Sequence, residues 1–162
     1  GQIPEPGMLV GNCNVWDEKN CLMYVNRPDR LTLSDLLVGT EIFMFPANPS
    51  AYFYHKSLHD VAGLYDADDH YSMDLDFLLR AVRVANVRYV NEAFGNFRLI
   101  PGTKPYEDIR VNGGSRARTV IRKYEEQLPV NARFLLRLKR AYYYTGYYLR
   151  HIAGRIRRIF RG

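Results

Sequence analysis

Apolar and polar positions alternate along several short segments of the chain in the way that is typical of β-strands. Met8 to Trp16 and Cys21 to Val25 alternate on either side of the polar residues 17–20, which predicts two strands joined by a hairpin turn. Residues 51–54 predict a third strand after an irregular connection that contains two prolines. Two more strands are predicted further along, at residues 87–90 and 93–99.

Other segments repeat apolar residues every three or four positions, which is the spacing of a helix. The longest such segment in the first hundred residues runs from Ser72 to about Ala85. Capping signals predict two shorter helices, from Thr32 to Gly39 and from Ser57 to Gly63. Because strands and helices alternate, the predicted fold class is α/β, with a mixed sheet and flanking helices.

The sequence Asn112-Gly113-Gly114-Ser115 separates two parts of opposite charge. Residues 1–112 hold 10 Lys or Arg against 15 Asp or Glu, whereas residues 113–162 hold 13 against 2, and the chain carries a formal net charge of +6. The second part is helical in pattern, with a break at Pro129. We therefore expect an acidic body over residues 1–112 and a basic helical extension over residues 113–162.

Composition narrows the class of protein further. With 162 residues, of which 47% are apolar, the chain can bury one sizeable core. It has no run of roughly 18 apolar residues and no basic-then-apolar segment at its N-terminus, so a cytoplasmic location is expected. Cys13 and Cys21 flank the predicted turn without facing each other, which favours two free thiols and gives little support to a zinc site.

Two carboxylates begin the predicted helix at residues 72–85, directly after the acidic turn at residues 66–69. A carboxylate in the first helical turn stays ionised readily, so it can accept a proton, although acidic residues also occur there for capping alone. Asp76 is four residues from Arg80 and can form an ion pair with it along the helix. Asp74 has no such partner in the sequence, which makes it the stronger candidate for chemistry.

Five segments spread over more than half of the chain resemble, in order, the C-terminal half of a family-2 glycosyltransferase with the GT-A fold. These segments are Gly11-Asn12-Cys13-Asn14-Val15, Phe45-Pro46-Ala47-Asn48-Pro49-Ser50, Gly63-Leu64-Tyr65-Asp66, Tyr71-Ser72-Met73-Asp74-Leu75-Asp76-Phe77-Leu78-Leu79-Arg80 and Asn96-Phe97-Arg98-Leu99-Ile100-Pro101-Gly102-Thr103-Lys104. The resemblance implies that the body is the acceptor-side half of a GT-A domain, whose sheet is Rossmann-like. It also implies that the chain is a fragment, without the half that binds the nucleotide.

By this resemblance, Asp74 is the general base of an inverting transfer of a sugar from a nucleotide-sugar to a hydroxyl, in the synthesis of a cell-surface polysaccharide or another glycan. The substrate-binding residues that it implies are Asn48, Asp76, Arg98 and Lys104. A divalent metal, Mg²⁺ or Mn²⁺, is expected for the complete enzyme, with ligands outside this chain. The sequence departs from the family at Met73, where a glutamate is usual, and at Ile100, where a histidine is usual.

The C-terminal extension has the composition of a helix that lies on a membrane. From Arg133 to Arg161 there are nine basic residues and no acid, interleaved with apolar residues at helical spacing and a cluster of tyrosines. We expect contact with anionic lipid at the inner membrane face, through Arg137, Arg140, Tyr143, Tyr147, Arg155 and Arg158. The alternatives are a helix packed against its own body and, less favoured, a nucleic-acid-binding segment. A non-catalytic membrane-binding module is the alternative to an enzyme.

Overall fold

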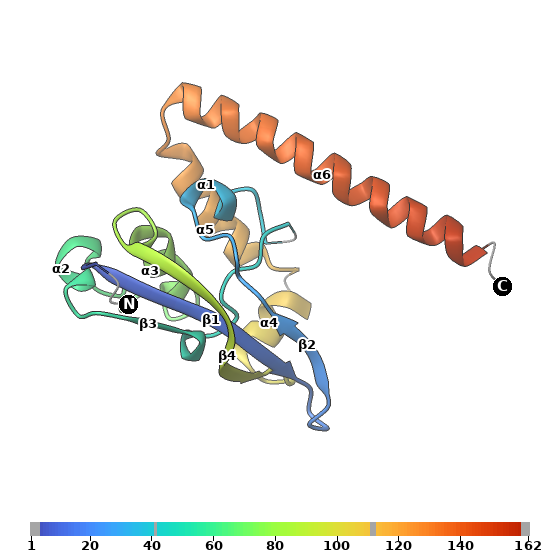
Figure 1. The fold of residues 1–162 in the computed structure, drawn as a ribbon, viewed down its shortest axis with the longest axis horizontal. Helices are drawn as coiled ribbons and strands as arrows, with labels where there is room; N and C mark the ends of the chain where they lie inside the picture. The colour runs from blue at the N-terminus through green and yellow to red at the C-terminus, as the bar shows by residue number, and fades with distance from the viewer. Residues whose placement is uncertain (1–3, 41, 111–112, 160–162) are drawn as a thin grey trace.

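The computed structural model describes residues 4–40, 42–110 and 113–159, and the side chains of residues 151 and 153–159 lie outside that description. Figure 1 shows its helices and strands. In chain order they are β1 (Gly7–Trp16), β2 (Leu22–Asn26), α1 (Leu33–Leu36), the 3-10 helix η1 (Pro49–Ala51), β3 (Tyr52–Tyr54), α2 (Leu58–Ala62), α3 (Met73–Ala81), β4 (Asn86–Arg98), α4 (Lys104–Arg110), α5 (Ser115–Glu126) and α6 (Val130–Ile159). The predicted α/β class is confirmed at this level.

β1 is the central strand of a four-stranded mixed sheet. β4 pairs with it in parallel along its whole length, from Gly7 to Trp16. β3 pairs antiparallel with its first half and β2 antiparallel with its second half. Since β4 occupies one edge of β1, β3 and β2 share the other edge. The hairpin of β1 and β2 was predicted, and both cysteines in it are free thiols.

The core forms where α3 packs against β1. Phe77 and Leu79 of α3 and Met8 and Val10 of β1 are fully buried in one cluster. Met8 and Val10 are two residues apart, as neighbours on one face of a strand are. α3 is buried on more than the predicted stripe, because Phe77, Leu78 and Leu79 are all buried. α3 is thereby held with its first turn, and Asp74, at the margin of the core.

η1 is held close to β4 at Gly95. A Cβ on Gly95 would lie 2.9 Å from both the carbonyl carbon and the carbonyl oxygen of Ser50, so a larger residue would push the two segments apart. Asn48 caps η1, and its side chain accepts a hydrogen bond from the Ser50 backbone N–H at 3.0 Å. This contact fixes one wall of the candidate site described below.

The structure differs from the sequence prediction twice within residues 86–110: two predicted strands are one, and one helix was not predicted. The two strands predicted there are one strand, β4, because its register against β1 shifts between Val10 and Asn12 and takes in the polar residues that suggested a turn. One of them, Asn91, accepts a 3.0 Å hydrogen bond from the side chain of buried Asn12. Helix α4 was not predicted, because Pro101, Gly102 and Pro105 suggested a loop.

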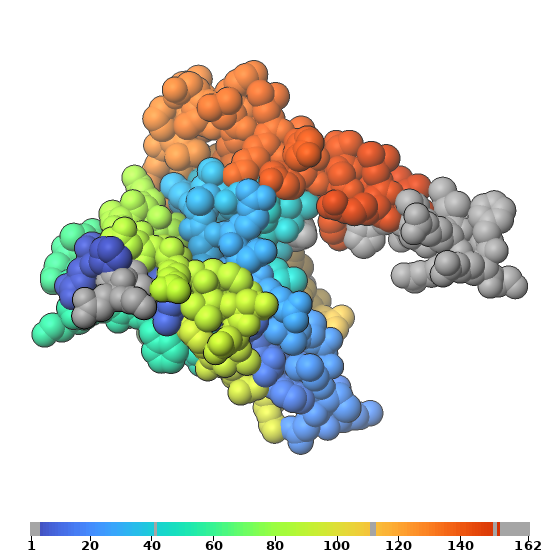
Figure 2. All heavy atoms as spheres, viewed as in Figure 1, coloured from blue at the N-terminus to red at the C-terminus, as the bar shows by residue number. Residues whose placement is uncertain are grey.

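The predicted boundary at residue 112 does not separate two cores. Val120, Ile121 and Tyr124 of α5 and Leu136 of α6 are buried in the same cluster as β1 and α3. α5 and the first turns of α6 therefore pack into the same hydrophobic core as the sheet and α3. The remainder of α6 projects beyond it as a long single helix (Figures 1 and 2).

α6 is joined to α1 by a buried ion pair. Lys139 Nζ lies 2.8 Å from Oδ1 of Asp35, and Asp35 is 4% exposed. The next residue along α6, Arg140, donates to the Leu37 carbonyl at 2.7 Å and pairs with Glu125 of α5 at 2.9 Å. These contacts set the direction in which α6 leaves the body.

Candidate active site

A pocket of about 330 Å³ opens at the start of α3, between η1, α4 and the start of α5. We call it the Asp74 pocket. The side chains that matter for its chemistry are Asn48, Tyr52, Tyr71, Asp74, Lys104 and Arg116. Much of the remaining wall is apolar and includes Phe45, Leu75 and Ile109. A hollow that combines an apolar wall with a few convergent polar groups is the usual form of a small-molecule site.

Asp74 lies in the first turn of α3 and lines this pocket. No described residue forms an ion pair or a side-chain hydrogen bond with its carboxylate. The side chain is exposed on its outer side, but the pocket walls remove water from the other side, and this desolvation raises the pKa of Asp74. A carboxylate with a raised pKa and no protein partner is suited to accept a proton from a bound hydroxyl.

Asp76, predicted to bind substrate, has a structural role instead. Its side chain is 11% exposed, and its carboxylate receives hydrogen bonds from Tyr124 at 2.8 Å, Arg80 at 2.9 Å and Lys123 at 3.2 Å. Burial alone would raise the pKa of Asp76, but these three donors lower it overall. The predicted substrate-binding role of Asp76 is therefore corrected, because its carboxylate is already occupied in joining α3 to α5. The predicted ion pair between Asp76 and Arg80 is confirmed.

Two cations lie against the ring of Tyr71 at the pocket. The Arg116 guanidinium is 3.5 Å from the ring centroid, and Lys104 Nζ is 5.1 Å from it. Lys104 also donates to the carbonyl of His70 at 3.1 Å, and Arg116 lies 3.8 Å from Asp108. Sequence analysis found Lys104 but not Arg116, since nothing in the sequence shows that the start of α5 returns to α3.

Tyr52 brings a buried phenol to the same pocket. The residue is 6% exposed, and its hydroxyl makes no hydrogen bond of ordinary geometry with a described residue, although the Tyr65 hydroxyl lies close enough to affect its pKa. Burial raises the pKa of Tyr52 to about 12, so this hydroxyl stays protonated at neutral pH and remains available as a donor. The strand pattern of residues 51–54 marked Tyr52 only as an inward-facing position.

The structure brings Asn48 and Lys104 together with Asp74 but leaves Arg98 elsewhere. Arg98 ends β4 and hydrogen-bonds to the side chain of Asn20, in a separate hollow that it shares with Trp16 and Asn96. The predicted substrate set is therefore divided between two places. Within the described residues, Arg98 has no contact with the Asp74 pocket.

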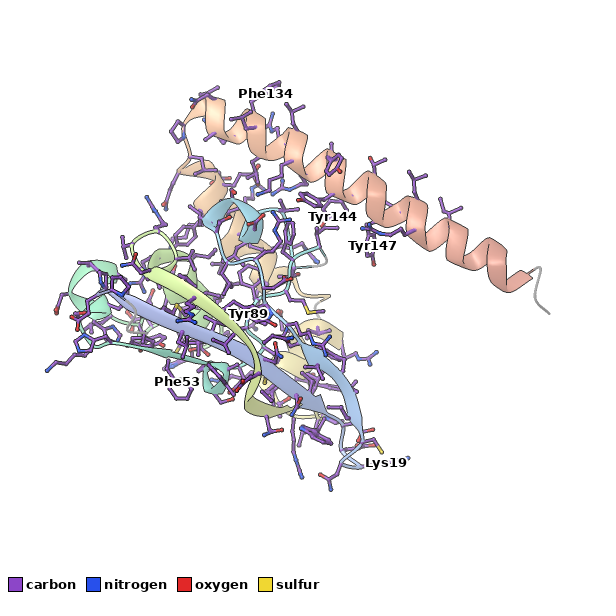
Figure 3. All side chains as sticks on the ribbon, in the orientation of Figure 1. Lys19, Phe53, Tyr89, Phe134, Tyr144 and Tyr147 are labelled. Carbon is purple, nitrogen blue, oxygen red and sulfur yellow. The ribbon has the colours of Figure 1, made fainter. Side chains whose placement is uncertain are left out.

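A second candidate surface runs along α6. Phe134, Leu138, Tyr142, Leu149 and Ile152 follow one another at helical spacing, and each is more than half exposed. We call these residues the outer face of α6. Figure 3 shows Phe134 on the side of α6 that points away from the body, whereas Tyr144 and Tyr147 point toward it.

The residues predicted to bind a membrane are not all on this surface. Arg140 is bonded to α1 and α5, and Tyr143 accepts a 2.9 Å hydrogen bond from Arg30 and stacks edge-on against Phe43. Both are corrected, because packing against the body occupies them. Tyr147 faces the body side (Figure 3), and Arg137 is exposed. The side chains of Arg155 and Arg158 lie outside the described residues.

No group of three or more metal-ligating side chains occurs in the part of the chain that the structure describes. We therefore derive no step of the chemistry through the divalent metal that the resemblance implies. None of the described helices has both the length and the hydropathy needed to cross a membrane. Comparisons with protein-family models, curated proteins and solved structures find no match to this chain.

Proposed function

We propose that this chain is the acceptor-side part of an inverting glycosyltransferase of GT-A type, with Asp74 as the general base. The observation that carries the proposal is the unpartnered carboxylate of Asp74 at the wall of a pocket of about 330 Å³. A structural carboxylate in the first turn of a helix would be expected to bond to a neighbour, as Asp76 does two residues later. The order of the five sequence segments supports the same assignment.

In the proposed reaction, the acceptor hydroxyl enters the Asp74 pocket and loses its proton to the carboxylate as its oxygen attacks the anomeric carbon of the donor sugar. The bond from that carbon to the nucleoside diphosphate breaks, and the diphosphate leaves with the electron pair. The raised pKa of Asp74 makes it a better proton acceptor at neutral pH than an ordinary aspartate. Lys104 and Arg116 bring positive charge to the pocket, and Asn48 and Tyr52 bring polar atoms.

The test is transfer activity of the longest natural gene product that contains this sequence, measured with a panel of nucleotide-sugars and glycan acceptors. Asp74→Asn should lower kcat by about 10²-fold or more and leave the circular dichroism spectrum unchanged. Asp60→Asn, an equal change of charge at an exposed position of α2, is the matched control and should keep full activity. Normal turnover in Asp74→Asn would overturn the assignment of the base.

The outer face of α6 favours a second function, adsorption to an anionic membrane surface. This face carries five large residues, and each of them is more than half exposed in the described structure. Residues 127–162 contain no Asp or Glu, so two copies that joined through this face would bring like charges together. An anionic lipid surface would neutralise the same charges while it covers the apolar residues. This function is compatible with the first.

Vesicle flotation tests the second function. The chain should float with vesicles that contain phosphatidylglycerol, should not float with neutral phosphatidylcholine, and should be released by salt. Leu138→Asp on the outer face should reduce binding about tenfold, whereas Val61→Asp, at an exposed apolar position of α2, should not. Equal binding by these two variants, or a dimer in solution that only Leu138→Asp dissociates, would reject the membrane function.

A further inference from the structure

A second cavity, of about 520 Å³, lies between α5, α6 and the segment after α1. Five of its lining residues are arginines: Arg118, Arg122, Arg133, Arg137 and Arg140. Among the residues that the structure describes, the acids in its wall are Glu125 and Glu126. We call this cavity the arginine pocket. It is separate from the Asp74 pocket, since the two share only Thr40.

Both acids in the arginine pocket are already paired. Glu125 lies 2.9 Å from Arg140, and Glu126 lies 3.0 Å from Arg122. The remaining positive charges are therefore those of Arg118, Arg133 and Arg137. Within the described part of the chain, Arg118 bonds to the backbone carbonyl of Gly113 at 2.6 Å, and the guanidinium groups of Arg133 and Arg137 have no bond. A carbonyl acceptor leaves the guanidinium charge uncompensated. Three such charges around one hollow repel one another and favour an anion between them.

The helical spacing explains how these side chains converge. Arg133, Arg137, Arg140 and Tyr144 follow at intervals of four, three and four, so they form one row along the side of α6 that faces the body, where Figure 3 places Tyr144. α5 supplies Arg118 and Arg122 from the opposite wall. A guanidinium presents a planar fork of donors that matches two oxygens of one group. Forks from two helices that surround one hollow suit a phosphoryl group, which offers several oxygens in different directions.

We propose that the arginine pocket binds a phosphoryl group, either that of an anionic lipid headgroup or that of a soluble phosphate or diphosphate. The lipid source rests on the membrane function proposed above; the pocket itself does not. Arg137 is exposed and lies between the row and the outer face, since it follows Phe134 by three positions and directly precedes Leu138. It is therefore the member of the row that a headgroup at the outer face would meet first.

Two binding measurements on the whole chain test the proposal. In solution, titration calorimetry with inorganic pyrophosphate should detect binding by the wild-type chain, weakened about tenfold in Arg137→Gln. On vesicles of equal surface charge, the chain should prefer phosphatidic acid, which exposes a phosphomonoester, to phosphatidylglycerol, and pyrophosphate should compete. Arg150→Gln is the matched control, because Arg150 is on the same helix, carries the same charge and does not line the pocket.

The outcomes separate the pocket from the membrane function. If pyrophosphate binds and vesicles do not, the pocket is supported with a soluble ligand and the membrane function fails. If vesicles bind without preference and pyrophosphate does not, the membrane function stands and the pocket proposal is overturned. Equal losses in Arg137→Gln and Arg150→Gln would also overturn it, because they would show that only the overall charge of α6 matters.

Discussion

Asp74 and Asp76 are separated by one residue on α3, yet their carboxylates meet opposite surroundings. Asp76 accepts hydrogen bonds from Tyr124, Arg80 and Lys123, whereas Asp74 lines a pocket and has no protein partner among the described residues. The pKa of Asp76 is accordingly lowered below its ordinary value, after burial is offset by its donors, and desolvation raises the pKa of Asp74. The two residues are thus a matched pair, since the same substitution has opposite expected effects on stability.

We predict that Asp76→Asn destabilises the chain and that Asp74→Asn does not. Loss of the charged acceptor from a buried network should lower the free energy of unfolding by about 1–3 kcal/mol. Asp74→Asn should be neutral or slightly stabilising at pH 7, because folding disfavours the ionised form of Asp74. Urea titrations of both variants measure this. If Asp74→Asn proved the more damaging variant, Asp74 would have a structural partner in solution.

The pH dependence of these variants should also differ in sign. The folded pKa of Asp76 is below its unfolded value, so its contribution to stability is present above the unfolded pKa and is lost as pH falls through the folded pKa. The folded pKa of Asp74 is above its unfolded value. Its contribution to stability is therefore present below the unfolded pKa and is lost as pH rises through the folded pKa. Relative to wild type, Asp76→Asn should therefore recover stability in acid. Any advantage of Asp74→Asn should disappear there.

The buried hydroxyl of Tyr52 gives a prediction about the pocket wall. Because this buried hydroxyl makes no hydrogen bond of ordinary geometry, although Tyr65 lies close enough to affect its pKa, Tyr52→Phe should leave stability unchanged or raise it by up to about 1 kcal/mol. Tyr65→Phe is the control, because the Tyr65 hydroxyl lies 3.3 Å from that of Tyr54, and its removal should cost about 0.5–1.5 kcal/mol. Thermal unfolding compares them. An equal cost in both variants would mean that the Tyr52 hydroxyl is satisfied in solution.

The sequence predicts most elements of this fold but not how they meet. Local signals located β1, β2, α3 and α6, because strand alternation, capping and helical spacing are encoded in neighbouring residues. Asp74 was also found locally, as a helix-start carboxylate without an ion-pair partner. Arg116 was missed, and the network around Asp76 was not foreseen, because the contacts of both depend on α5 returning to α3, as in the Tyr124–Asp76 bond between residues 48 positions apart. No local pattern records such a return.

The contact between β4 and η1 predicts a strict requirement for glycine at position 95. In Gly95→Ala, the new methyl group would lie 2.9 Å from backbone atoms of Ser50, which cannot rotate away as a side chain can. We expect a loss of about 1–3 kcal/mol, the usual cost of overpacking. Gly146→Ala is the control, since a Cβ there meets nothing within 4 Å and alanine favours a helix. Equal stability of the two variants would show that η1 moves freely relative to the sheet.

The buried pair of Lys139 and Asp35 predicts how firmly α6 is held to the body. Asp35 also accepts a 2.6 Å bond from the Thr32 hydroxyl and lies 3.2 Å from Arg30. Although burial would raise its pKa, Lys139, Thr32 and Arg30 together lower it. Lys139→Met should therefore reduce stability by about 1–2 kcal/mol, because it leaves a buried carboxylate with one fewer cation. It should also speed amide hydrogen exchange in the first half of α6, while the second half, which projects from the body, should change little.

Arg150→Met is the control for this prediction. It removes an equal charge from the exposed part of α6 and should change stability by no more than about 0.5 kcal/mol. If both variants exchanged alike, the direction of α6 would depend on Leu136 and Tyr143 rather than on this ion pair.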